Sequence, residues 1–175
     1  MNGLGLESGR VRVVPYNAGW PGLYAAEVER FQPFLERAGI RLAVEHSGST
    51  SVPGLAAKPI IDILAGLGRE DERSQVIAAL QEAGYVYRGE QGIPGRDFFR
   101  RGTPRQYHVH LTSIGSVFWH EHLDFRNWLR AHQDVADAYM TLKRGLADRY
   151  PADREAYTNG KTGFILEVLQ AARSP

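Results

Sequence analysis

The chain has 175 residues, which is enough for one domain with a buried core and short for two. Hydrophobic residues make up 43% and charged residues 23%, the balance of a soluble globular protein. The formal net charge is only +1, with acidic and basic residues mixed along the sequence, which argues against a general nucleic-acid binder. The absence of cysteine excludes disulfides, thiolate metal sites and cysteine nucleophiles.

The sequence predicts no export or membrane segment. Residues 1–9 are glycine-rich and lack the apolar core of a signal peptide, and no stretch approaches the roughly 20 apolar residues of a membrane helix. We therefore expect a flexible arm over residues 1–9, a single domain over residues 10–175, no membrane partner and a cytoplasmic location. The pattern predicts no oligomeric state.

The N-terminal part predicts a strand followed by a helix. Apolar and basic residues alternate over residues 11–15, which is typical of a short edge strand. Asn17 is a suitable cap for the next helix, Pro21 is tolerated in its first turn, and Gly39 ends the pattern. The buried face of this helix is marked by an i, i+4, i+7, i+11 spacing of Tyr24, Val28, Phe31 and Leu35.

The middle of the chain predicts a sheet, and the last third predicts helices. Strands are expected over residues 40–46, 59–64, 85–88, 97–101 and 106–112, with an amphipathic helix over residues 71–83. After Val117 the apolar spacing is helical, including residues 136–150 and a last helix from about Lys161. The predicted fold class is α+β (mixed α/β): a mixed sheet flanked by helices, with a helical C-terminal third.

A glycine- and hydroxyl-rich stretch, residues 47–51, lies between the first two central strands. Gly48 permits the close backbone approach that a phosphate requires, and free N–H and hydroxyl groups around Ser49 and Thr50 suit an anion. If Val52 begins a helix, its positive end adds to this preference, and Lys58 supplies a nearby cation. Alone, such a stretch is more often a plain turn.

Asp62 stands inside a strongly apolar strand, between Ile61 and Ile63. An isolated ionised carboxylate there is costly, so the side chain must be paired, capped or bound to a metal near the strand end. A structural hydrogen bond to a neighbouring loop is the alternative to a functional role.

His108 and His110 are separated by one residue on a predicted strand, so their side chains point to the same face. Two neighbouring imidazoles can ligate a divalent metal or exchange protons, and Asp62 on an adjacent strand would complete that arrangement. The alternative is a polar strand face turned to solvent.

Four other polar residues are weaker candidates. His122 falls on an apolar helix face and is typical of a satisfied, half-buried histidine. Arg126 and Arg130 are within reach of phosphates in principle, although a solvated helix face with intrahelical ion pairs explains them at least as well. Lys161 starts the last predicted helix, where the helix dipole does not favour a cation, and this mismatch hints at an anionic partner.

Four segments resemble the GrpB protein family: residues 46–63 (HSGSTSVPGLAAKPIIDI), 107–111 (YHVHL), 125–130 (FRNWLR) and 157–161 (YTNGK). The resemblance covers almost the whole chain after Arg10, and the first segment is long enough to be highly specific. GrpB proteins are assigned to the DNA polymerase beta-like nucleotidyltransferase superfamily, so the resemblance implies a nucleotidyltransferase-like mixed sheet.

The resemblance also implies a set of site residues. Members of that superfamily bind the triphosphate of an NTP at a Gly-Ser loop, matched here by Gly48 and Ser49, and hold metal ions with carboxylates, of which Asp62 matches the first. The chain departs from the pattern at Leu64, where the second carboxylate is expected, and offers His108 or His110 in place of the third. One carboxylate with two imidazoles suits Mn²⁺ or Zn²⁺ better than Mg²⁺.

Three functions compete at this point. The first is a metal-dependent nucleotidyltransferase that moves a nucleotidyl group from an NTP to an unknown acceptor, using Mg²⁺, Mn²⁺ or Zn²⁺. Its predicted residues are Asp62 and Ser49 for catalysis, Asp62, His108 and His110 for the metal, and Gly48, Ser49, Thr50, Lys58 and Lys161 for the phosphates. The second is a module that binds a nucleotide or another phosphorylated small molecule without turnover. The third is a metal-dependent hydrolase built on Asp62 and the two histidines.

Overall fold

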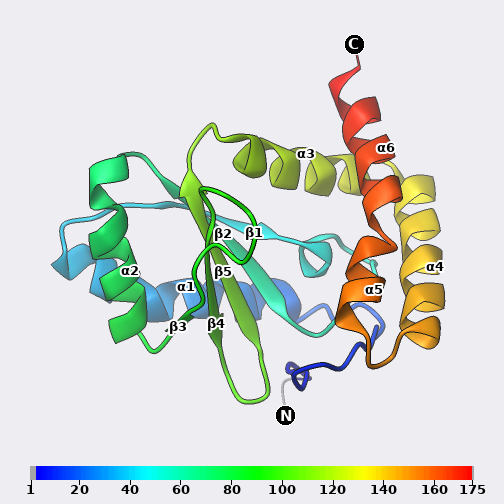
Figure 1. The fold of residues 1–175 in the computed structure, drawn as a ribbon, viewed down its shortest axis with the longest axis horizontal. Helices are drawn as coiled ribbons and strands as arrows, with labels where there is room; N and C mark the ends of the chain where they lie inside the picture. Colours follow the sequence, from blue (N-terminus) through cyan, green and yellow to red (C-terminus); the bar gives the residue numbers. More distant parts are fainter. Residues whose placement is uncertain (1–2, 175) are drawn as a thin grey trace.

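A five-stranded mixed sheet forms the centre of the protein in the computed structural model, which describes residues 3–174. The strand order is β1-β2-β5-β4-β3, with β2 and β5 parallel and the other neighbours antiparallel. The strands are β1 (Ala43–Ser47), β2 (Ile61–Leu67), β3 (Val86–Tyr87), β4 (Asp97–Arg101) and β5 (Tyr107–Ser113). This sheet and the helical last third confirm the predicted fold class (Figure 1).

Six helices accompany the sheet within the described residues. They are α1 (Trp20–Arg37), α2 (Arg73–Glu82), α3 (Val117–Ala131), α4 (Gln133–Arg149), α5 (Arg154–Asn159) and α6 (Thr162–Arg173). Figure 1 shows α4, α5 and α6 side by side beyond one end of the sheet, with α3 leading across to them. The sequence did not predict α5, because a helix of six residues is too short to show a periodic apolar face.

The alternation of side chains along the central strands separates an apolar face from a polar one. Ile61 and Ile63 of β2 and Val109 of β5 are wholly buried in the core that α1 and α2 cover. Successive side chains of a strand point to opposite faces, so Asp62 and His108 turn away from that core, towards the helical C-terminal third. The predicted common face of the two histidines is therefore confirmed.

Two expectations for the backbone are wrong. The edge strand over residues 11–15 is reduced to a single bridge between Val14 and Ala57, because Val11 instead packs with residues of the helical third. Val52 does not begin a helix: a 3-10 turn over Ser49–Ser51 precedes it, and Val52 itself is extended. Pro53 explains this, since a proline disfavours the helical region for the residue before it.

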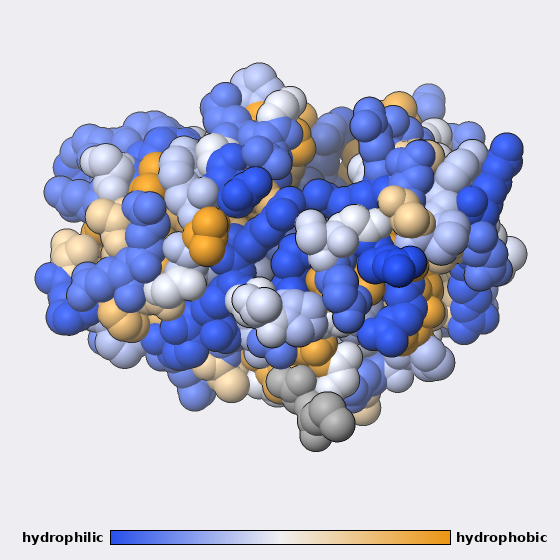
Figure 2. All heavy atoms as spheres, turned by 60° about the horizontal axis from the view of Figure 1, so that its bottom comes forward, coloured by the Kyte–Doolittle hydropathy of each residue, from blue (hydrophilic) through white to orange (hydrophobic). Residues whose placement is uncertain are grey.

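The segment expected as a flexible arm lies against the domain over Gly5 and Leu6. The Gly5 N–H donates to the Pro59 carbonyl at 2.9 Å, and Leu6 pairs with Arg105 and is only 1% exposed. The first two residues of that arm lie outside the described residues. Figure 2 shows a mostly hydrophilic face in which apolar side chains are scattered between polar ones. Within residues 3–174, no helix has the length and the apolar character needed to cross a bilayer.

The buried face of α1 holds a carboxylate that the apolar spacing did not predict. Glu27 is 2% exposed, and it accepts hydrogen bonds from Arg101 Nε at 2.6 Å, from Arg30 Nη2 at 3.1 Å and from the hydroxyl of Tyr85. Burial acts to raise the pKa of Glu27, but these hydrogen bonds together bring it below its ordinary value. Glu27 thereby joins α1 to β4 as an ionised group.

We expect Glu27→Gln to lower the free energy of unfolding by about 3 kcal/mol near neutral pH, because it leaves two guanidiniums beside a neutral amide in a buried site. The stabilisation by the ionised Glu27 is present above the unfolded-state pKa and is lost as the pH falls through the lowered native pKa. The difference between wild type and variant should therefore shrink in acid. Urea unfolding of both proteins over a pH series measures this.

The matched control is Glu82→Gln, which removes a 60% exposed partner of Arg37. It should change the unfolding free energy by less than about 1 kcal/mol. Equal losses in the two variants, or a Glu27→Gln loss that does not depend on pH, would contradict the role given to Glu27.

Candidate functional site

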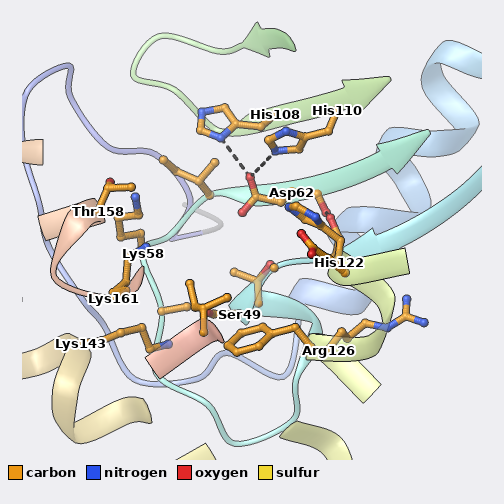
Figure 3. Close-up of a pocket in the computed structure, with 18 of the residues that line it drawn as sticks. Ser49, Lys58, Asp62, His108, His110, His122, Arg126, Lys143, Thr158 and Lys161 are labelled. Atoms are coloured by element: carbon orange, nitrogen blue, oxygen red, sulfur yellow. Dashed lines mark hydrogen bonds and ion pairs between the residues drawn. The ribbon is translucent and has the colours of Figure 1, made fainter. Parts of the chain in front are cut away.

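A cavity of about 820 Å³ opens between the polar face of the sheet and the helical C-terminal third (Figure 3). This volume lies within the range of small-molecule sites. Among the residues predicted for function, its wall contains Gly48, Ser49, Thr50, Lys58, Asp62, His108, His110 and Lys161. Segments that are far apart in the sequence thus converge on one cavity, as the sequence predicted.

The turn after β1 lies directly against Asp62. Gly48 has a φ of +67°, a conformation that favours glycine, and a Cβ at this position would lie 2.7 Å from Asp62 Oδ2. Ser47 reinforces the contact, since it is the register partner of Asp62 and donates its hydroxyl to the Asp62 carbonyl at 3.2 Å. Glycine is required here both by its backbone conformation and by the carboxylate beside it.

The hydroxyl groups of this turn have different partners. Thr50 is 1% exposed and its Oγ1 lies 3.0 Å from His46 Nε2, so the hydroxyl predicted to bind phosphate is already engaged. Ser51 donates to the Gly48 carbonyl at 2.6 Å and closes the turn. The Ser49 side chain faces the cavity and interacts with Tyr139 of α4. Of the three hydroxyls, Ser49 is the one placed to meet a ligand.

Asp62, His108 and His110 form a compact group on β2 and β5. Asp62 Oδ1 lies 3.0 Å from His108 Nδ1 and 3.3 Å from His110 Nε2, and the potential ligand atoms of the three residues all lie within 4.8 Å of one another. Burial lowers the pKa of His108 to about 4. Burial acts to raise the pKa of Asp62, but the hydrogen bonds from the two histidines hold it well below its ordinary value. An ionised carboxylate and a neutral imidazole are the forms that bind metal ions.

The donor set of this group fits a borderline divalent ion. One carboxylate oxygen and two imidazole nitrogens suit Mn²⁺ or Zn²⁺, whereas hard Mg²⁺ prefers oxygen ligands. Leu64, at the position expected for a second carboxylate, is wholly buried and lies opposite His110 in the sheet register. It brings no oxygen to the group.

The chain contains three lysines, and all three line this cavity. In Figure 3 their side chains come together at one end of the cavity, beside Thr158 and opposite His122. The ammonium groups of Lys58 and Lys161 lie 5.2 Å and 4.8 Å from the centre of the Tyr157 ring. Within residues 3–174, no carboxylate comes within 4.0 Å of any of the three amines. The cavity therefore has a cationic end whose amines form no ion pair with the described carboxylates.

Lys143 on α4 is the functional candidate that sequence reasoning missed. Its side chain is 1% exposed, its Nζ donates to the Ala56 carbonyl, and it lies 4.8 Å from the centre of the Tyr139 ring. Burial lowers the pKa of Lys143 and of Lys161 to about 7. Two signals were available: the spacing of Ala136, Tyr139 and Lys143 on one helix face, and the scarcity of lysine in the chain.

The arginines of α3 join this helix to β1 and its turn, and Arg126 also lines the cavity. Arg126 is 9% exposed and donates to Glu45 at 2.7 Å and to the His46 carbonyl at 2.9 Å. Arg130 donates to the Ser51 carbonyl at 2.7 Å. The expected intrahelical ion pairs are wrong, because both side chains reach across to β1 and its turn, whereas Arg130 is exposed as a solvated helix face requires.

His122 is satisfied and half-buried, as expected. Its Nδ1 lies 2.9 Å from the Phe118 carbonyl and its ring stacks on Phe118. Burial lowers the pKa of His122 to about 4, so the ring is neutral at physiological pH. It belongs to the cavity wall near His110.

Comparisons with known proteins agree with this fold. A profile of the GrpB protein family matches residues 10–171. A UPF0157 protein of Pseudomonas aeruginosa is 41% identical over 168 residues, which cover 93% of this chain and 68% of that relative. The crystal structure of the conserved protein GrpB from Enterococcus faecalis matches with a TM-score of 0.82 at 35% identity, over 92% of this chain and 96% of the other.

A more distant match concerns the fold alone. The Cid1 poly(U) polymerase, in a structure bound to MgATP, matches with a TM-score of 0.57 at 11% identity, over 85% of this chain and 50% of the polymerase. That fold is the one the resemblance implied. The match over residues 10–171 and the relatives that share most of the chain show that this protein belongs to the GrpB family and has a nucleotidyltransferase-like fold.

Proposed function

We propose that the cavity binds a nucleoside triphosphate and that the protein transfers its nucleotidyl group to an acceptor molecule. The observation that carries this proposal is that every lysine of the chain lines the cavity that also holds the Gly48–Ser49 turn and Asp62. Three amines that form no ion pair among the described residues suit a ligand with several negative charges, and a polyphosphate supplies them. The nucleotidyltransferase-like fold supports the same substrate class.

The polyphosphate is proposed to lie at the cationic end. Lys58, Lys143 and Lys161 pair with its oxygens, and the Ser49 hydroxyl and the turn at Gly48 complete the contacts. Because burial lowers the pKa of these amines in the free protein, they take up protons as the phosphates arrive. The same charges then stabilise the departing pyrophosphate.

The reacting phosphorus is proposed to lie nearer Asp62. The oxygen of an acceptor hydroxyl attacks the α-phosphorus and its proton passes to solvent. The bond between this phosphorus and the bridging oxygen breaks, and pyrophosphate leaves with the electron pair. A divalent ion held by Asp62, His108 and His110 would supply a Lewis acid for the α-phosphate. In the metal-free protein, the carboxylate of Asp62 accepts from the histidines and so fixes their orientation.

A second candidate is nucleotide binding without transfer. The observation in its favour is Leu64, which fills the position of a second carboxylate with a buried apolar side chain. Two-metal phosphoryl transfer relies on clustered carboxylates, and this group offers one. The two candidates share a ligand and differ in turnover.

Binding can be tested separately from turnover. We expect NTPs to raise the melting temperature of the protein, and Lys161→Met and Ser49→Ala to weaken NTP binding by roughly tenfold or more, since each removes a hydrogen bond to a charged group. Isothermal titration measures the affinities. Arg144→Met is the matched control, because it removes an exposed positive charge next to Lys143 but outside the cavity, and should change affinity by less than about threefold.

The lysines also provide a direct probe of occupancy. Acetic anhydride reacts with neutral amines, so mass spectrometry of acetylated peptides reports on Lys58, Lys143 and Lys161 individually. Bound NTP should protect all three. Unchanged acetylation together with an unchanged melting temperature for all four NTPs would contradict the proposed ligand.

Turnover is tested by pyrophosphate release. Wild-type protein with Mn²⁺ or Mg²⁺, each NTP and a mixed pool of small-molecule acceptors should release pyrophosphate, and Asp62→Asn should reduce the rate by about 100-fold or more while NTP binding persists. Absence of pyrophosphate release with every NTP, in protein that binds NTP, would reject transfer and support the second candidate.

The unpaired amines also predict how stability depends on pH. A lysine with a lowered native pKa carries fewer protons in the native state than in the unfolded chain, so the unfolding free energy should rise from about pH 7 to about pH 9. Above this window, buried tyrosines such as Tyr157, whose pKa is raised to about 12 by burial, act in the opposite direction. Lys143→Met should flatten the rise and stabilise the free protein at pH 7.

Denaturant unfolding of ligand-free protein in this pH window measures the effect. Arg144→Met is again the control and should keep the wild-type slope. A wild-type profile that is flat, or that falls, between about pH 7 and about pH 9 would contradict the presence of buried, uncompensated amines.

A further inference from the structure

His110 has a hydrogen-bond partner on the side of its ring that faces away from Asp62. Arg96, just before β4, is 5% exposed, and its Nη1 lies 3.2 Å from His110 Nδ1. Its Nη2 donates to the Glu90 carbonyl at 2.7 Å, and its guanidinium lies 4.9 Å from the centre of the Phe98 ring. Arg96 is thus held in the cavity wall in contact with one member of the Asp62, His108 and His110 group.

The direction of this hydrogen bond follows from chemistry alone. A guanidinium donates and cannot accept, so His110 Nδ1 is the acceptor. A neutral imidazole whose Nδ1 accepts carries its proton on Nε2, and Nε2 is the atom that lies 3.3 Å from Asp62 Oδ1. Arg96, His110 and Asp62 therefore form a chain in which each group donates to the next.

His108 also donates a hydrogen bond to Asp62, but its other ring nitrogen has different surroundings. The ionised carboxylate only accepts, so His108 Nδ1, 3.0 Å from Asp62 Oδ1, carries the proton. The far nitrogen of His108, Nε2, is buried without a hydrogen-bond partner among the described residues. Among the described residues, the protonated nitrogen of His108 is therefore set by Asp62 alone.

Metal binding needs the opposite arrangement of protons. An ion between the three residues takes the lone pairs of His108 Nδ1 and His110 Nε2, and each ring proton then sits on the far nitrogen. For His110 this would direct the Nδ1–H at the N–H of Arg96, donor against donor. On metal binding, the proton of His110 thus moves from Nε2 to Nδ1, and the charge of the ring does not change.

We propose that Arg96 is a positioning residue that holds His110 with its proton on Nε2 and keeps the metal-binding group incomplete until the guanidinium leaves Nδ1. The inference rests on the assignment of the ion to Asp62, His108 and His110 under the proposed function. It adds a residue that is not a metal ligand but controls when Asp62, His108 and His110 can bind the ion.

Arg100, on β4, provides a matched control. Its guanidinium also lies over the Phe98 ring, at 5.2 Å from its centre, and its Nε is also buried without a partner among residues 3–174. Arg100 lies opposite His108 in the register, and no hydrogen bond joins it to His110. Removing either arginine deletes one positive charge near the group, but only Arg96 contacts His110 Nδ1.

The experiment titrates Mn²⁺ alone, without nucleotide, into wild type, Arg96→Met and Arg100→Met, with free Mn²⁺ followed by electron paramagnetic resonance. Arg96→Met should bind Mn²⁺ roughly tenfold or more tightly than Arg100→Met, because a hydrogen bond from a charged donor no longer opposes ligation. Equal affinities in the two variants, or no Mn²⁺ binding by folded Arg96→Met, would overturn the proposal.

A second measurement needs no variant. Long-range ¹H–¹⁵N correlation spectra of metal-free wild type should show His110 protonated on Nε2 and bare on Nδ1, and a spectrum with the proton on Nδ1 would overturn the proposal. Neither measurement uses a nucleotide. A failure of NTP binding or transfer would therefore leave both results intact, and the two proposals fail separately.

Discussion

The Asp62 carboxylate on the central strand is the constraint on which the rest of the cavity depends. A charged group flanked by Ile61 and Ile63 on β2 is tolerated only if hydrogen bonds and opposite charge compensate for lost water. His108 and His110 of the neighbouring parallel strand supply those hydrogen bonds. The missing side chain of Gly48 leaves room for the carboxylate at the end of β1.

Arginine and lysine have different roles in this protein. Arginines join separate segments: Arg101 binds the buried Glu27, Arg126 binds Glu45 on β1, and Arg130 binds the Ser51 carbonyl in the turn that carries Ser49. Lysines occur only in the cavity wall, where burial brings their pKa values towards neutrality. Lysine suits this position because its compact ammonium group changes protonation readily when buried, whereas guanidinium stays charged. Burial of these amines is expected to destabilise the free protein.

The residue pattern along each segment predicted the five strands of the sheet. It also predicted that Asp62, His108 and His110 lie together. The period of two along β2 and β5 places Asp62, His108 and His110 on one face, and the parallel pairing of these strands then brings them together. The glycine- and hydroxyl-rich composition singled out the Gly48–Ser49 turn, which the structure places against Asp62. Functional roles for these residues stay predictions.

What the pattern did not predict depends on contacts distant in sequence. Glu27 reads as a break in an apolar helix face until Arg101 and Tyr85 are seen beside it. Lys143 reads as a solvated helix residue until the Ala56 carbonyl and the cavity are in place. The extended backbone of Val52, in contrast, was predictable from the following proline, which disfavours a helix at that position.

The most direct test of the account is a crystal structure with a non-hydrolysable NTP analogue and Mn²⁺. The account predicts the terminal phosphates at the amines of Lys58, Lys143 and Lys161, the α-phosphate facing Asp62, and an anomalous Mn²⁺ peak beside Asp62. An analogue bound outside this cavity, or phosphates that contact none of the three lysines, would contradict it.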